Sequence, residues 1–130
     1  MVRLTDEQGQ FLKTKNLATI ATIRPDGSAQ LTPVWIDWDG ENVVFNTAEG
    51  RFKPRYIRRN PMVSVEVLDR EDPYRWISIT GPAEISEDGA EEHINKLSHR
   101  YNDGRDYNYV PGEKRLIVRI KPERVTARGL

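Results

Sequence analysis

The sequence predicts a mainly β protein in which about six antiparallel strands form a small barrel. Short segments rich in β-branched and aromatic residues recur along the 130 residues, and turn signals such as Asp39-Gly40 separate them. The segment 62–68 alternates apolar and polar residues, as a strand with one buried face does. A meander of this kind leaves exposed edges unless it closes, so we expect a closed barrel.

The first half of the chain predicts one helix and then three strands. Thr5 is followed by two acidic residues, which indicates an N-capped helix running to about residue 15. Apolar β-formers bounded by turn signals then predict strands at residues 17–23, 29–38 and 42–47. The basic stretch 46–61 interrupts this meander with a short helix.

The second half predicts three strands and a longer helix. The strands are expected at residues 62–68, 75–85 and 115–125. Ser86 would cap a helix over residues 87–101, in which Ile94 and Leu97 form an apolar stripe. A loop containing three tyrosines follows this helix.

Composition excludes several classes of protein. The chain has 20 basic and 20 acidic residues, so no overall field recruits nucleic acid or an acidic membrane, and any anion site must be local. It has no cysteine, which removes thiol nucleophiles and thiolate zinc sites. The N-terminus lacks a signal-like apolar run. We expect a single domain over residues 1–130 in the cytoplasm.

Basic side chains gather where the short helix is expected to begin. Pro54 is tolerated in a first helical turn, which places the start of the helix between Arg51 and Lys53. The free N–H groups and positive dipole end then lie beside Arg51, Lys53 and Arg55, a combination that suits phosphate. Positive charge opposes the dipole at this end, and such a local conflict is typical of a functional site.

A solvated helix face is an equally good explanation of these charges from spacing alone. Arg58 and Arg59 lie at the helix end that basic residues normally favour. Phe52 and Tyr56, four residues apart, are expected to face the core. No Gly-rich phosphate motif of a known type is present.

The chain carries no self-contained catalytic motif, so a cofactor is expected to carry any chemistry. His93 and His99 do not share a helix face, and both are interpreted as surface residues. Trp76 is interpreted either as a core residue or as a ring at a cleft or subunit interface. A proton donor from Tyr101, Tyr107 or Tyr109 is less well supported than surface packing of this loop.

Three segments together carry a resemblance to a known superfamily. They are "LATIATIRPDGSAQLTPVW", "FNTAEGRFKPRYIRRNPMVSVEV" and "DPYRWISITGPAEI". They resemble the pyridoxamine-phosphate-oxidase-like split-barrel flavoproteins, and in particular their F420-dependent branch. The resemblance extends from about Leu17 to Val125 and implies a split β-barrel homodimer with two cofactor sites at the subunit interface.

The resemblance also implies roles for individual residues. Lys53 and Arg51 would hold the cofactor phosphate, with Arg55 nearby. The remaining cofactor-binding residues would be Thr47 and Ala48 beside the phosphate, Thr32, Pro33 and Val34 along the ring system, and Trp76 from the partner subunit. The implied reaction is hydride transfer from a reduced deazaflavin to an electron-poor enone, quinone or nitro compound.

Two positions depart from the superfamily's pattern. Pro54 and Tyr56 stand where a small residue and an asparagine are common, and both lie beside the expected phosphate site. The acidic tail of coenzyme F420 favours a basic surface, which Arg55, Arg58 and Arg59 provide. F420 is therefore the expected cofactor and FMN the alternative. An FMN-dependent oxidase or reductase and a non-catalytic flavin-binding protein are the competing functions.

Overall fold

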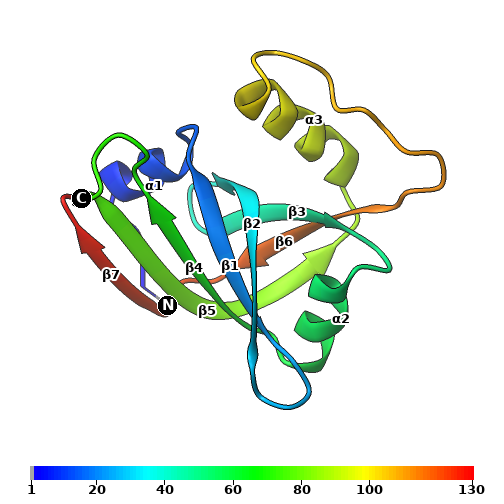
Figure 1. The fold of residues 1–130 in the computed structure, drawn as a ribbon, viewed down its shortest axis with the longest axis horizontal. Coiled ribbons are helices and arrows are strands. Elements are labelled where there is room, and N and C mark those ends of the chain that lie inside the picture. Colours follow the sequence, from blue (N-terminus) through cyan, green and yellow to red (C-terminus); the bar gives the residue numbers. More distant parts are fainter. Residues whose placement is uncertain (1) are drawn as a thin grey trace.

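The computed structural model describes residues 2–130 and consists of seven strands and three helices (Figure 1). In chain order the elements are α1 (Asp6–Leu12), β1 (Leu17–Ile23), β2 (Ala29–Trp38), β3 (Val43–Ala48), α2 (Phe52–Arg59), β4 (Met62–Leu68), β5 (Trp76–Ser86), α3 (Ala90–Tyr101), β6 (Arg115–Ile120) and β7 (Arg124–Arg128).

Six strands close into an antiparallel barrel. Their order is β4-β1-β2-β3-β6-β5, and pairing of β5 with β4 completes the ring. The barrel is filled by the residues that the alternation predicted to face inward. Val65 and Val67 of β4 and Ile77 and Ile79 of β5 are at most 1% exposed. The prediction of a mainly β, closed antiparallel barrel is confirmed.

The single strand predicted at residues 115–125 is wrong, because the chain forms two strands there. β6 pairs with the second half of β5, and β7 pairs with its first half along the same edge. The segment between β6 and β7 passes very close to Gly81 of β5, where an added Cβ would stand 1.8 Å from the backbone oxygen of Lys121. Lys121 and Glu123 still donate backbone hydrogen bonds to Pro82 and Thr80, so the regular register of the two strands is interrupted at Pro122 while the chain stays beside β5.

The helix α2 begins where Pro54 predicted. Arg51 is its N-cap residue and Pro54 lies in the first turn. Its buried face consists of Pro54 and Ile57, three residues apart. Phe52 is 55% exposed and stacks on Tyr56 outside the core, so the expectation that these two rings face inward is wrong.

The helix α3 covers the outer face of β2, β3 and β6. Its first residue, Ala90, packs against Val44 and Ile117, which point away from the barrel interior. The helix begins at Ala90 with Gly89 as N-cap residue at a φ of 76°. Ser86 ends β5 instead of capping this helix, which corrects the prediction. Figure 1 shows α2 and α3 on the same side of the barrel.

Candidate functional site

A cavity of about 350 Å³ lies between β2, the start of α2, α3 and the loop 102–114. Its apolar lining comes from Leu17, Pro33, Val34, Trp35, Ile94 and Leu97, and its polar lining from Asn46, Arg51, Lys53, Tyr107 and Arg115. Apolar walls with a few convergent polar groups are typical of a small-molecule site. This lining suits a ligand that combines a ring system with an anionic group.

Three cations meet in this cavity. Arg51 and Lys53 come from the start of α2, and Arg115 from the first residue of β6. Burial lowers the pKa of Lys53, and the nearby positive charges of Arg51 and Arg115 lower it further. The ammonium of Lys53 donates a hydrogen bond to the hydroxyl of Thr32 at 3.2 Å. Three like charges at one place repel each other, so an anion bound among them would be stabilised.

The start of α2 adds backbone donors to this cluster. Arg51 is the N-cap residue, and no side chain accepts a hydrogen bond from the first turn. Helix N–H groups without a partner and the positive end of the helix dipole both favour an anion. The donor set therefore fits a cofactor phosphate, as the basic stretch predicted.

The other residues that the resemblance places beside the ring system and the phosphate of the cofactor divide into two groups. Pro33 and Val34 line the cavity, and Thr32 reaches it through Lys53. Thr47 and Ala48 are at most 3% exposed and do not line it. The Thr47 hydroxyl has no hydrogen-bond partner among residues 2–130.

Arg55 and Trp76 lie outside the cavity. Arg55 lines a neighbouring hollow of about 400 Å³ with Arg51, Arg58 and Arg59, and its guanidinium lies 5.4 Å from the centre of the Phe52 ring. Trp76 pairs with Leu68 of β4 and Arg128 of β7. Because β4 separates it from β1, Trp76 does not reach the cavity of its own chain.

Sequence reasoning missed Arg115 and Asn46. The Arg115 Nε donates a hydrogen bond to Asn46 Oδ1 at 2.8 Å, and both residues are at most 8% exposed. Strand alternation places both on the outer face of the barrel, where solvent is the normal expectation. They are buried because α3 and its following loop cover that face, and no local pattern signals this.

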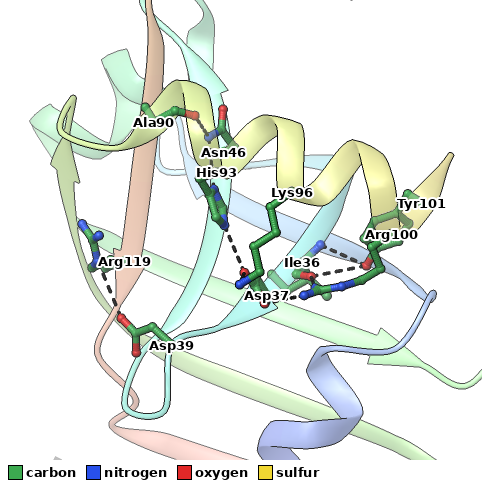
Figure 2. A network of polar contacts seen from close by, with 10 residues as sticks. All are labelled: Ile36, Asp37, Asp39, Asn46, Ala90, His93, Lys96, Arg100, Tyr101 and Arg119. Carbon is green, nitrogen blue, oxygen red and sulfur yellow. Dashed lines mark hydrogen bonds and ion pairs between the residues drawn. The ribbon is translucent and has the colours of Figure 1, made fainter. Parts of the chain in front are cut away.

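Asn46, which lines the cavity, also belongs to the buried polar network drawn in Figure 2. Its Nδ2 donates to the carbonyl of Ala90 at 2.9 Å and lies 3.1 Å from His93 Nδ1. Since the amide nitrogen can only donate, His93 Nδ1 accepts, which leaves the ring proton on Nε2. That nitrogen lies 3.2 Å from Asp37 Oδ2. His93 is only 10% exposed, so its interpretation as a surface residue is wrong.

Asp37 is the centre of this network. Its carboxylate is 4% exposed and lies 3.1 Å from Arg100 and 3.4 Å from Lys96, both on α3 (Figure 2). Burial raises the pKa of Asp37, but the hydrogen bond from His93, the backbone N–H of Trp38 and the two cations outweigh it. The net effect holds the pKa well below its usual value, so Asp37 stays ionised.

The three tyrosines at the end of α3 and in the loop after it make different contacts. Tyr101 stacks on Trp35 with ring centres 5.4 Å apart, and its hydroxyl is occupied by the backbone of Ile36 and Asn16. This excludes Tyr101 as a proton donor in the cavity. Tyr107 lines the cavity, whereas Tyr109 is 49% exposed and donates to a backbone carbonyl of α3.

A second hollow, of about 510 Å³, lies beside β5 and the other side of α2. It is larger than the cavity beside Lys53, but the basic side chains that line it are paired with acidic side chains of the same hollow. Arg58 makes two hydrogen bonds to Glu49 at 2.6 and 2.7 Å, and Lys114 pairs with Glu87 at 2.9 Å. No excess of positive charge remains there, so the cavity beside Lys53 is the better anion site.

No helix within residues 2–130 is long and apolar enough to cross a membrane. No group of three or more metal-ligating side chains is close enough together to hold an ion within the same residues.

Comparison with known proteins places this arrangement in a family. Residues 4–129 match the sequence profile described as pyridoxamine 5'-phosphate oxidase. The chain belongs to the pyridoxamine 5'-phosphate oxidase family. The match covers every helix and strand of the structure, so the resemblance seen in three segments extends over nearly the whole chain.

Members and relatives of this family are similar along nearly their full length. The F420H(2)-dependent biliverdin reductase of Mycobacterium tuberculosis (strain CDC 1551 / Oshkosh) is 27% identical over 127 residues, covering 95% of this chain and 87% of that protein. A solved F420 reductase is 32% identical with a TM-score of 0.82, covering 95% and 98% of the two chains. A conserved hypothetical protein of Mycobacterium tuberculosis is 28% identical with a TM-score of 0.75, covering 98% and 86%.

Proposed function

We propose that this protein is an F420-dependent oxidoreductase that transfers a hydride to an electron-poor small molecule, such as an enone, a quinone or a nitro compound. The observation that carries the proposal is the cation cluster of Arg51, Lys53 and Arg115 beside an apolar wall. Similarity to two F420-linked reductases supports a deazaflavin over FMN.

Residues of the cluster bind the phosphate of the cofactor. Arg51 and Lys53 supply charge-assisted hydrogen bonds together with the first N–H groups of α2. Arg115 is a third phosphate ligand, and Asn46 fixes its orientation through the 2.8 Å bond to Nε. Thr32 positions Lys53 in the same way.

The apolar wall orients the ring system. Pro33 and Val34 line the cavity from β2, and Trp35 extends the wall as a ring held parallel to Tyr101 within 8°. When bound, reduced F420 supplies the hydride. The chain itself contributes position and a water-poor environment, which accounts for the absence of an acid–base motif in the sequence.

The neighbouring hollow suits the acidic tail of F420. Arg58 is already neutralised by Glu49, which leaves Arg55 and Arg59 as the cations available to a tail. This hollow shares Arg51 with the cavity, so a ligand anchored at the phosphate reaches it without crossing the barrel.

The outer face of β1, β2 and β4 is the surface on which we expect a second copy to dock. Leu17, Leu31 and Leu68 are 46–65% exposed there, an unusual density of large apolar side chains. The cavity opens beside Leu17, so a homodimer formed through this face would bring the Trp76 of one copy toward the site of the other. The proposed complex is a homodimer with small-molecule ligands, without nucleic acid or membrane.

The dimer has a direct test. Leu31→Asp places a charge at the proposed interface without touching the cavity, and we expect it to shift the protein to a monomer in light scattering after gel filtration. Trp76→Ala should then weaken cofactor binding only in the dimeric protein. A wild-type protein that is monomeric and fully active would contradict this arrangement.

Activity separates the candidate functions. Reduced F420 is incubated with the protein and a panel of acceptors that includes enones, quinones, nitro compounds and biliverdin, and its oxidation is followed by absorbance. Reduced FMN is run in parallel. Faster turnover with FMN would favour an FMN-dependent enzyme, and tight cofactor binding without turnover of any acceptor would favour a flavin-binding protein.

A further inference from the structure

One carboxylate is held among the cations of the cavity. Glu113, from the loop before β6, lies 3.2 Å from Arg115 and 3.5 Å from Arg51. The Tyr107 hydroxyl donates a hydrogen bond to its Oε1 at 2.8 Å. The Glu113 side chain is only 14% exposed, and its three partners, Arg51, Tyr107 and Arg115, all line the cavity.

The charge of Glu113 persists at neutral pH. Burial raises the pKa of Glu113, but the hydrogen bond from Tyr107 and the charges of Arg115 and Arg51 lower it by more. The cluster thus holds three positive charges and one fixed negative charge. Two of the three cations that would bind a phosphate already share a carboxylate.

We propose that Glu113 sets the charge of the anion that this cavity accepts, and that it selects a phosphodiester over a phosphate monoester. The inference rests on the proposed function in assigning the cavity to a cofactor phosphate. The phosphate of F420 is a diester with one negative charge. FMN carries a monoester, whose charge is about −1.5 to −2 at pH 7.

The physical reason is that repulsion grows with the charge of the ligand. A like charge about 6 Å away weakens binding roughly three- to tenfold for each unit of ligand charge, at effective dielectric constants of about 80 to 40. Glu113 therefore costs the monoester about twice as much free energy as the diester. The result is a preference for F420 over FMN that does not depend on contacts with the ring.

The substitution Glu113→Gln tests the charge at nearly constant volume. FMN and F420 are titrated against the wild-type protein and the variant. At pH 8, where the monoester carries nearly two negative charges, the FMN dissociation constant should fall roughly three- to tenfold more than that of F420. Glu113→Asp keeps the charge and should keep the wild-type ratio. Glu87→Gln removes the same charge beside Lys114, away from the cavity, and should leave both constants unchanged.

A second pair of probes makes the test independent of the cofactor. Methyl phosphate and dimethyl phosphate are titrated at pH 8 and followed by the amide resonances at the start of α2. Glu113→Gln should raise the affinity ratio of monoester to diester roughly three- to tenfold. An unchanged ratio with these probes would overturn the inference. If neither F420 nor FMN binds the wild-type protein, the proposed function fails, and the methyl phosphate pair still decides the role of Glu113.

Discussion

Two charged clusters lie on either side of Asn46, and they differ in their balance of charge. At Asp37, one buried carboxylate is surrounded by His93, Lys96 and Arg100, and all of the partners come from α3. At the cavity, Arg51 and Arg115 share one carboxylate, that of Glu113, whereas Lys53 donates a hydrogen bond to Thr32. In the first cluster, every basic side chain contacts the carboxylate of Asp37, and these contacts hold α3 against the barrel. The second retains positive charge that only a ligand can satisfy.

The largest expected effect is a loss of stability when the Asp37 cluster is disrupted. Asp37→Ala leaves Arg100 and His93 without their buried partner, and removing one member of a buried pair costs about 3–5 kcal/mol of unfolding free energy. Urea denaturation measures it. Asp106→Ala is the control, because Asp106 is 80% exposed where it pairs with His99, and its loss should cost less than about 1 kcal/mol. Equal costs would show that the Asp37 cluster does not hold α3 in place.

At the cavity, the expected effect is on binding. Lys53→Ala should weaken F420 binding by about 1.5–3 kcal/mol, the usual value for a hydrogen bond to a charged group. Fluorescence titration measures it. Lys114→Ala removes an equal charge that is paired with Glu87 on the surface, and binding should then be unchanged. A similar loss in both variants would mean that only the net charge of the protein matters.

The stability that the Asp37 cluster contributes should also fall in acid. The pKa of Asp37 is lower in the folded protein than in the unfolded chain, so the folded state binds fewer protons. Its stabilising contribution is complete above about pH 5 and is lost as pH falls below the usual carboxyl pKa of about 3.9. Denaturation midpoints of Asp37→Asn should therefore fall less steeply with acid than those of the wild type. Parallel curves would assign the acid sensitivity to other carboxylates.

The smallest expected effect is a gain in stability, not a loss. The pKa of Lys53 is lowered in the folded protein by burial and by its cationic neighbours, so its charge opposes folding at neutral pH. Lys53→Met should raise the unfolding midpoint slightly in the absence of ligand while it weakens binding. Lys114→Met should not raise it, because the hydrogen bond to Glu87 raises the pKa of Lys114. A lower midpoint in Lys53→Met would place Lys53 among the stabilising charges.

Local pattern was sufficient for most of the fold. The strands at 17–23, 29–38 and 62–68 have the predicted bounds because their composition and bounding turns are local signals. The start of α2 followed from Pro54. The break between β6 and β7 was missed, since it depends on the close approach of Lys121 to Gly81, which lies 40 residues earlier in the chain.

The site was only partly predictable for the same reason. Arg51 and Lys53 lie in one basic stretch beside a helix start, and sequence reasoning found both. Arg115 lines the cavity, and Glu113 pairs with two of its cations, although both residues are 60 or more positions away from Arg51 and Lys53 in the chain. Asn46 looks like a solvent-facing strand residue until α3 covers it. Such residues are assigned only when the covering element is placed.

One measurement tests the central claim most directly. F420 is titrated against the wild-type protein and against the double variant Arg51→Ala with Lys53→Ala, and urea denaturation shows whether both are folded. Loss of two charge-assisted bonds should weaken binding by more than about a hundredfold in a variant that unfolds at a similar urea concentration. Unchanged F420 affinity in the folded double variant would contradict the assignment of this cluster as the phosphate site.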